Sequence, residues 1–216
     1  MTTATRLLIH GATGRMGEAV LRLADEAPDM RVVCAVARQI PTPAMADGIA
    51  WVAADALDDA PDYDIAIDFS LPEGFDRVLD VCTARGRPLV SGTTGLSKAQ
   101  QQALERHALR IPVVWAANFS LGVAVLSDLV ERAASLLSGW DCDIVESHHI
   151  HKKDAPSGTA LALGGCAEQG GAAPRYASLR AGDIIGEHLV QFATAGERIE
   201  LVHRATNRDI FARGAL

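Results

Sequence analysis

Short apolar runs alternate with longer amphipathic stretches over the first half of the chain. Runs with the length and composition of buried strands occur at 6–10, 31–37, 49–53, 65–70, 88–90 and 113–116. Helix-spaced apolar residues lie between several of these runs, over 18–27, 73–85 and 97–108. Strands that alternate with helices are typical of βαβ units, in which the strands are parallel. This half of the chain therefore predicts an α/β fold with a Rossmann-type parallel sheet.

The pattern changes after Asn118. Apolar residues at helical spacing predict one long amphipathic helix over 121–137. A strand at 141–147, a helix over 157–166 and a flexible loop over 164–174 follow. The stretches 184–192 and 198–205 alternate apolar and polar residues on either side of a turn, which predicts an antiparallel pair of strands. The second half thus predicts a smaller α+β domain with a mixed or antiparallel sheet.

Three glycines, Gly11, Gly14 and Gly17, lie between the first predicted strand and the first predicted helix. They form a Gly-x-x-Gly-x-x-Gly variant of the dinucleotide fingerprint, in which glycines let backbone N–H groups approach a pyrophosphate at a helix N-terminus. A glycine turn with a purely structural role is the alternative. The βαβ context of the triad favours nucleotide binding.

The end of the second predicted strand indicates which nucleotide is preferred. An acidic residue that would hold the ribose 2′-hydroxyl is expected there, but the chain has Ala37 followed by Arg38. An arginine at this place suits a 2′-phosphate, so we predict a preference for NADPH, with NADH as the second cofactor. A solvated surface charge is the alternative role for Arg38.

Composition and charge exclude several function classes. The 216 residues are 49% hydrophobic and 22% charged, which is typical of a folded globular protein. A net charge of -7 argues against binding to nucleic acid or to an anionic membrane surface. The four cysteines are scattered and no apolar run approaches the roughly 18 residues of a membrane span. We expect a cytoplasmic protein with free thiols.

The stretch "ESHHIHKKDAPSGTA", from Glu146 to Ala160, holds three of the seven histidines and two of the three lysines. A metal site is one interpretation, but Lys152 and Lys153 would place cations against the metal and no zinc-type ligand set is complete. Exposed polar residues at the end of a strand are a second interpretation. Neither accounts for the number of titratable nitrogens, and we predict that no metal is bound.

An acid–base and anion-binding site is the third interpretation, and the residue types suit it best. Histidine can donate a proton near neutral pH, and a lysine beside other cations has its charged form disfavoured. Residues 154–159 form a turn into a helix whose first N–H groups can receive a carboxylate. This combination predicts a small anionic substrate that is protonated as it is reduced.

These motifs together resemble one family, the 4-hydroxy-tetrahydrodipicolinate reductases, also called dihydrodipicolinate reductases, of bacterial diaminopimelate and lysine biosynthesis. The resemblance spans nearly the whole chain. Besides the histidine cluster it rests on "GATGRMG" at 11–17, "DFSLPEG" at 68–74, "SGTTG" at 91–95, "AANFSLGV" at 116–123, "RAGDIIGEH" at 180–188 and "FARGAL" at 211–216.

The resemblance implies a role for each matching residue. His148 would be a proton donor and Lys152 a second acid, while His149 would contact one substrate carboxylate and Gly158 with Thr159 the other. The cofactor would be bound by Gly11, Ala12, Thr13, Gly14, Arg15, Met16, Arg38, Gly92, Thr93, Thr94, Ala116, Ala117, Asn118 and Phe119. The reaction implied is hydride transfer from NAD(P)H to a cyclic imine dicarboxylate, with protonation giving tetrahydrodipicolinate.

The resemblance also implies an organisation into domains. A dinucleotide-binding domain would span 1–118, with 206–216 returning to it, and a substrate-binding and oligomerisation domain would span 119–205. Edge strands within 184–205 would suit assembly into a homotetramer. The chain departs from the family in having only "GGAAPRYASL" before residue 180, and in ending at Leu216 where the family usually continues into a C-terminal helix.

Two other classes of function explain part of the pattern. A Rossmann oxidoreductase for another small substrate would use the glycines but leaves the histidine cluster without a role. A non-catalytic NADPH-binding sensor would make the histidines incidental.

Overall fold

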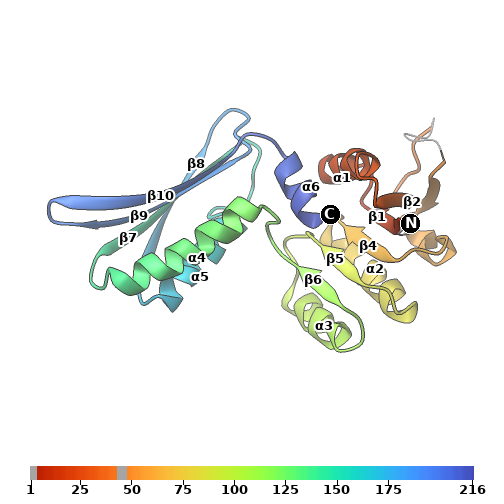
Figure 1. Cartoon of the computed structure of the whole chain (residues 1–216), viewed down its shortest axis with the longest axis horizontal. Helices are drawn as coiled ribbons and strands as arrows, with labels where there is room; N and C mark the ends of the chain where they lie inside the picture. Colours follow the sequence, from red (N-terminus) through yellow and green to blue (C-terminus); the bar gives the residue numbers. More distant parts are fainter. Residues whose placement is uncertain (1–3, 43–47) are drawn as a thin grey trace. The chain divides into compact units, whose positions relative to one another are not determined.

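A computed structural model of the chain describes residues 4–42 and 48–216. The chain divides into two compact units (Figure 1). One holds the described residues up to Ala117 together with Phe211–Leu216, and the other is Asn118–Ile210.

The described part of the first unit is built on a sheet of six parallel strands in the order β3-β2-β1-β4-β5-β6. The strands are β1 Thr5–His10, β2 Met30–Ala37, β3 Ala50–Ala53, β4 Ile65–Asp68, β5 Leu89–Ser91 and β6 Val113–Trp115. The connecting helices are α1 Arg15–Asp25, α2 Pro72–Ala84, α3 Lys98–Ala108 and the 3₁₀ helix η1 Ala54–Asp59. The strand order reverses between β1 and β4, and ligands of open α/β sheets bind at such a switch point.

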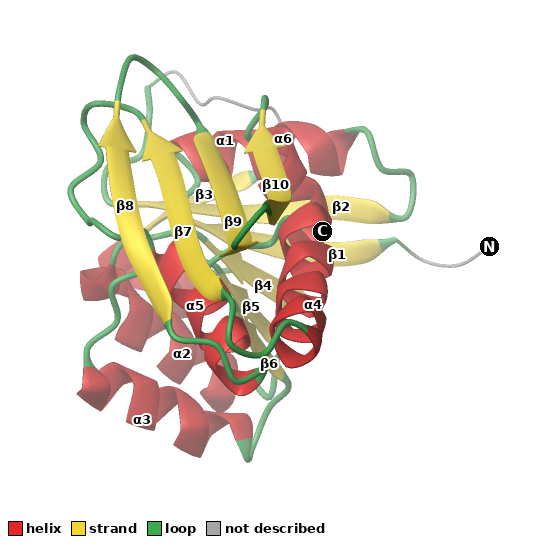
Figure 2. Cartoon of the chain, turned by 90° about the vertical axis from the view of Figure 1, so that its left-hand side faces the viewer, coloured by secondary structure: helices red, strands yellow, loops and turns green. Residues whose placement is uncertain are grey.

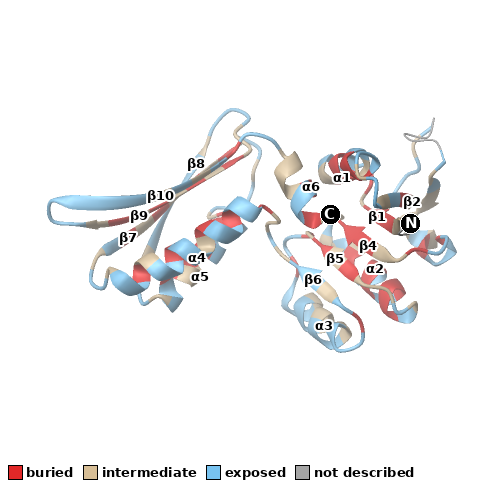
Figure 3. Cartoon of the chain, viewed as in Figure 1, coloured by how far each residue is buried: buried red, intermediate tan, exposed pale blue. Residues whose placement is uncertain are grey.

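Burial explains why these runs form strands. Leu8, Ile9, Ala35 and Ile67 are fully or almost fully buried, as strands covered on both faces require. Figure 3 shows buried residues concentrated in the central strands and on the inner faces of α1 and α2. The polar ends of β1, β4 and β5 are therefore held by a rigid core.

The second unit has a mixed sheet of four strands in the order β10-β9-β7-β8 (Figure 2). The strands are β7 Asp141–His148, β8 Pro174–Arg180, β9 Gly186–Thr194 and β10 Glu197–Ala205, and the helices are α4 Leu121–Leu136 and α5 Gly158–Gln169. β7 runs parallel to β8, whereas β9 is antiparallel to both β7 and β10.

One face of this sheet packs against α4 and α5. Alternate residues of β7 point to that face, first Cys142 and Ile144 in the apolar core and then Glu146 and His148. The same alternation that builds the core thus carries two ionisable side chains into a buried position at the end of β7.

The predicted fold class is confirmed: a Rossmann-type parallel-sheet unit is followed by a smaller α+β unit, whose sheet is mixed. Some elements differ from the predictions. α5 continues to Gln169 and β8 begins at Pro174, so most of the predicted flexible loop 164–174 is helix. β9 lies inside the sheet, so only β10 is an edge strand within 184–205.

Three of the elements were not predicted at all: the short 3₁₀ helix η1, the strand β8 and the final helix α6, Asp209–Ala215. β8 shows no alternation in its own burial and depends on backbone pairing with β7, which local sequence does not reveal. α6 spans only seven residues, too short for a periodic pattern to be recognised.

Two glycines, Gly165 inside α5 and Gly170 at its C-cap, provide a test of how closely α4 and α5 pack. A Cβ at Gly170 would lie 2.4 Å from the carbonyl oxygen of Glu131 in α4, whereas a Cβ at Gly165 would meet none of the described atoms within 4 Å. Gly170→Ala should therefore lower the free energy of unfolding by about 1–3 kcal/mol, because the α4 backbone must move. Gly165→Ala should raise it by about 0.5–1 kcal/mol. Urea unfolding of both variants checks this, and equal effects would contradict the packing described.

Candidate functional site

The loop after β1 is shaped by its glycines. Gly11 has a φ of +79°, and a Cβ there would lie 2.6 Å from the carbonyl oxygen of Phe69. A Cβ at Gly17 would lie 2.2 Å from the carbonyl oxygen of Gly11, so α1 can approach the loop this closely only with glycine. Gly14 is the N-cap of α1 and supplies no side-chain cap. The first N–H groups of α1 therefore have no side-chain acceptor at the N-cap, and a bound pyrophosphate could accept hydrogen bonds from them.

A cavity of about 580 Å³ opens beside this loop. It is lined by Gly11, Thr13 and Gly14, by Arg38 after β2, and by the segment 69–74 except Pro72. The shape of the glycine loop and the position of this cavity at the switch point of the sheet fit a dinucleotide.

The other predicted cofactor residues lie at several places. Ala12 is buried within the loop, and Arg15 and Met16 begin α1. Gly92, Thr93 and Thr94 follow β5, where a Cβ at Gly92 would lie 2.2 Å from the Phe69 ring. Ala116 and Ala117 follow β6. Asn118 and Phe119 belong to the second unit, where the Asn118 side-chain amide donates to the Thr159 hydroxyl at 3.0 Å.

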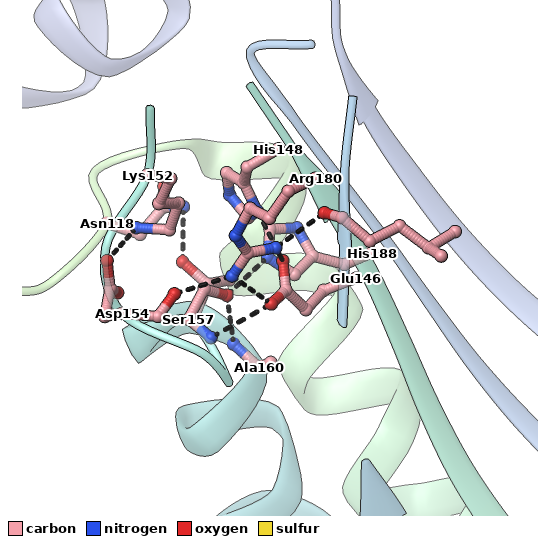
Figure 4. Close-up of polar contacts among 11 residues, drawn as sticks. Asn118, Glu146, His148, Lys152, Asp154, Ser157, Ala160, Arg180 and His188 are labelled. Atoms are coloured by element: carbon pink, nitrogen blue, oxygen red, sulfur yellow. Dashed lines mark hydrogen bonds and ion pairs between the residues drawn. The ribbon is translucent and has the colours of Figure 1, made fainter. Parts of the chain in front are cut away.

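Glu146 is the centre of the polar cluster in the second unit (Figure 4). Its carboxylate is fully buried and lies 2.5 Å from Nδ1 of His148, which is 7% exposed. Arg180, the last residue of β8, donates to both carboxylate oxygens, at 2.7 and 2.9 Å. A bidentate ion pair between Glu146 and Arg180 thus joins β7 to β8 near their ends, and the same carboxylate orients the imidazole of His148.

The segment after β7 is anchored to this cluster. Arg180 donates to the carbonyl oxygen of Asp154 at 2.6 Å, and the backbone N–H of Ser157 lies 3.3 Å from the Glu146 carboxylate. Lys152 forms an ion pair with Asp154 at 2.8 Å. These contacts bring Lys152 and His148 into one region, together with the start of α5.

Ser157 caps α5 and connects it to β9. Its hydroxyl oxygen accepts from the N–H of Ala160 at 3.2 Å and lies 3.2 Å from Nε2 of His188. The ring of His188 packs edge-on against that of His148, with centroids 5.2 Å apart. Gly158 and Thr159 occupy the first turn of α5, where backbone N–H groups can donate hydrogen bonds to an anion.

The site controls the charge of its ionisable groups. Burial raises the pKa of the Glu146 carboxyl, but hydrogen bonds from Arg180, Ser178 and His148 outweigh this and lower the pKa to about 2. Burial lowers the pKa of His148, and the neighbouring Glu146 offsets only part of that effect. Burial and the proximity of His148 lower the pKa of His188 to about 4. Glu146 is therefore a carboxylate at neutral pH, and His188 is neutral.

The residue of β9 that faces the second nitrogen of His148 is a glycine and has no side chain. A Cβ at residue 186 would lie 3.1 Å from Nε2 of His148, and the residue there is Gly186. With Nδ1 bound to Glu146, the imidazole presents Nε2 as its second proton-exchanging atom.

The structure brings together His148, Lys152, Gly158 and Thr159 of the predicted site, and places the His149 ring beside that of His151, with centroids 6.3 Å apart. Within the described part of the chain, no group of three His, Cys, Asp or Glu residues could hold a metal ion. Sequence reasoning missed Glu146, Arg180 and His188. Glu146 shares the inward face of β7 with His148, which was the available signal.

The dinucleotide-shaped loop and cavity, with a buried acid–base cluster in a separate unit, define a Rossmann-type oxidoreductase that uses a nicotinamide dinucleotide. The family models agree: residues 5–119 match the N-terminal part of dihydrodipicolinate reductase and residues 122–216 match its C-terminal part. The chain belongs to the dihydrodipicolinate reductase family, whose members act in diaminopimelate and lysine biosynthesis.

Individual relatives support this assignment. The chain is 68% identical to a 4-hydroxy-tetrahydrodipicolinate reductase of Stenotrophomonas maltophilia (strain K279a), over 99% of this chain and 90% of the relative. It is 64% identical to the 4-hydroxy-tetrahydrodipicolinate reductase of Xanthomonas axonopodis pv. citri (strain 306), over 100% of this chain and 90% of the relative. Its fold matches a dipicolinate-bound dihydrodipicolinate reductase from Paenisporosarcina sp. TG-14, with a TM-score of 0.79 at 21% identity, over 98% of this chain and 92% of that one.

Among the described residues, no helix has both the length and the apolar character needed to span a bilayer. The four cysteines, which all lie in the described part, are free thiols.

The depressed pKa of His188 predicts how stability depends on pH. The unfolded chain binds this proton with a pKa near 6.5 but the folded protein only near 4, so stability is highest above pH 6.5 and falls as the pH drops to 4. A difference of this size corresponds to a loss of up to about 3 kcal/mol. His188→Gln should flatten the unfolding free energy between pH 6.5 and 4.

Urea unfolding at several pH values measures this dependence. His151→Gln, which changes an exposed histidine of the same unit, should keep the slope of the wild type. An unchanged slope in His188→Gln would show that this histidine does not carry the effect.

Proposed function

We propose that the protein catalyses NAD(P)H-dependent reduction of 4-hydroxy-tetrahydrodipicolinate, through its dehydrated cyclic imine dicarboxylate, to tetrahydrodipicolinate. The observation that carries the proposal is that the buried Glu146–His148 pair, the Lys152–Asp154 ion pair and the start of α5 lie in one region. It combines proton donors, cations and backbone N–H groups, as a dicarboxylate that must be protonated requires. The structural neighbour from Paenisporosarcina binds dipicolinate, a dicarboxylate of this chemical kind.

The two carboxylates have separate binding groups in this proposal. Gly158 and Thr159 hold one carboxylate through the backbone N–H groups of the first turn of α5 and the threonine hydroxyl. The Asn118 side chain, which donates to the Thr159 oxygen, leaves the hydroxyl proton of Thr159 to be donated to the substrate. His149 contacts the other carboxylate.

His148 and Lys152 supply the proton. Burial keeps the pKa of free His148 below its ordinary value, and a bound dianion favours the protonated imidazole. The Glu146 carboxylate then stabilises the imidazolium through Nδ1, and Nε2 faces away from that carboxylate to donate. Lys152 exchanges its ion pair with Asp154 for the substrate, which places an ammonium group against the reacting ring as a second acid.

The nicotinamide dinucleotide supplies the hydride. We propose that it is held by the glycine-loop residues Gly11–Met16, by Gly92–Thr94 and by Ala116, Ala117, Asn118 and Phe119. Arg38 lines the cavity beside the end of β2, where a 2′-phosphate would be bound, and this supports a preference for NADPH over NADH.

The domain roles follow from these sites: residues 1–118 with 206–216 bind the dinucleotide, and 119–205 bind the substrate and form the oligomer. We propose a homotetramer assembled through the sheet of the second unit, whose face away from α4 and α5 carries Leu179 and Val202, 56% and 40% exposed. A cytoplasmic location agrees with the supply of reduced nicotinamide cofactor.

Lys152 has a matched control in its neighbour Lys153, which is exposed. Lys152→Ala should lower kcat by about 10²–10⁴-fold, because a positioned proton donor is lost, while the Kd for NADPH stays unchanged. Lys153→Ala should change kcat little. NADPH absorbance, with substrate generated from pyruvate and aspartate semialdehyde by the preceding synthase, measures turnover. Tight NADPH binding without any turnover by the wild type would instead indicate a cofactor sensor.

Arg38 should determine cofactor preference. Arg38→Gln removes a charge-assisted hydrogen bond to the 2′-phosphate and should raise the Kd for NADPH by about 10- to 150-fold without changing that for NADH. Arg31→Gln, an exposed arginine at the start of β2, is the matched control. Fluorescence titration with both cofactors measures the four constants, and equal loss of NADH and NADPH affinity would assign Arg38 a structural role.

A further inference from the structure

Asp68 ends β4 at the switch point of the parallel sheet, and its carboxylate is fully buried. Four hydrogen bonds from described residues reach its two oxygens. One oxygen lies 2.8 Å from Nδ1 of His10 and 3.0 Å from the backbone N–H of Ser70. The other lies 2.7 Å from both the Ser91 and the Thr93 hydroxyls. The carboxylate thus binds groups from three neighbouring strand ends.

These partners are adjacent to the two glycine loops of the nucleotide site. His10 directly precedes Gly11, while Ser91 and Thr93 flank Gly92. Backbone bonds add to the connection, because Phe69 N–H donates to the His10 carbonyl oxygen at 3.0 Å and Gly92 N–H to that of Asp68 at 2.8 Å. The loops after β1 and β5 are therefore held to each other through one side chain of β4.

The carboxylate is held in its charged form. Burial raises the pKa of Asp68, but hydrogen bonds from His10, Ser70 and Ser91 and the charge of His10 outweigh this, and the pKa is lowered. A buried carboxylate binds its donors about twice as strongly as a neutral acceptor does, and each donor that is lost leaves it less well compensated. The geometry of both loops is thereby tied to one network.

We propose that Asp68 is a positioning residue for the dinucleotide, which acts through His10 and Ser91 to hold the loop 11–17 and the loop 92–94 at the spacing that the bound cofactor requires. The proposal rests on the proposed function, since it assumes that both loops contact the cofactor. It adds His10, Asp68 and Ser91 to the residues on which cofactor affinity depends. Ser91 is fully buried, and its hydroxyl also accepts the Thr93 N–H at 3.2 Å, so an effect of its substitution reaches the cofactor through the position of the loop 92–94 and not by direct contact.

The test compares cofactor affinity with stability in four variants. Ser91→Ala and His10→Leu each remove one donor to Asp68, whereas His10→Asn keeps an N–H donor near the position of Nδ1. Thr83→Val is the matched control, because Thr83 is also a buried hydroxyl of the first unit, bound at 2.8 Å to the Leu79 carbonyl oxygen in α2. NADPH and NADH are titrated against each purified variant, and its Tm is measured.

Ser91→Ala and His10→Leu should raise the Kd of both cofactors by about tenfold or more and by the same factor, because the network holds loops that both cofactors would use and its hydrogen bonds to Asp68 do not involve Arg38. His10→Asn should recover much of the affinity. Thr83→Val should lower the Tm without changing either Kd.

Lower Tm values with unchanged Kd values in Ser91→Ala and His10→Leu would overturn the proposal and leave Asp68 a purely structural residue. The proposed function would survive that result, provided that the wild type binds NADPH. Failure of the wild type to bind either cofactor would overturn both.

Discussion

A carboxylate removed from water must be fully compensated, and in the second unit this constraint is met by the pairing of Glu146 with Arg180. Desolvation of a carboxylate costs several kcal/mol, which well-placed hydrogen-bond donors must offset. Arg180 provides both hydrogen bonds from the neighbouring strand end, while Ser157 and His148 fill the remaining positions. The end of β7, the end of β8 and the start of α5 are consequently fixed by one charge.

The buried carboxylate of Asp68 in the first unit is also compensated by hydrogen-bond donors, but by different ones. No arginine reaches it among the described contacts; an imidazole, two hydroxyls and a backbone N–H do. His10 and Ser70 also line the cavity beside the glycine loop, whereas Ser91 and Thr93 flank Gly92 after β5. Both units therefore place a buried carboxylate behind the loops that we propose to bind ligand, where its charge is already compensated by other donors.

Sequence reasoning singled out candidate residues that stand at a recognisable local spacing. Gly11, Gly14 and Gly17 sit three apart before a helix, and His148 and Lys152 lie in one dense cluster, so pattern alone indicated both sites. Glu146 and Asp68 escaped notice because their partners are remote in sequence: Arg180 is 34 residues from Glu146, and His10 is 58 from Asp68. β8 was missed for the same reason, since its pairing with β7 exists only in the folded chain.

The two proposed acids differ in how firmly they are held, and the difference suits their tasks. His148 stands on the last residue of a strand, with Nδ1 tied to a buried carboxylate, so its orientation is set before substrate arrives. Lys152 lies in the turn after that strand, and its ammonium group forms an ion pair with Asp154, whose side chain is 55% exposed. The Asp154 end of this ion pair is open to solvent, and we propose that a substrate carboxylate takes its place beside Lys152. In the proposed reaction the histidine would therefore fix where the proton is delivered, and the lysine would adjust to the bound substrate.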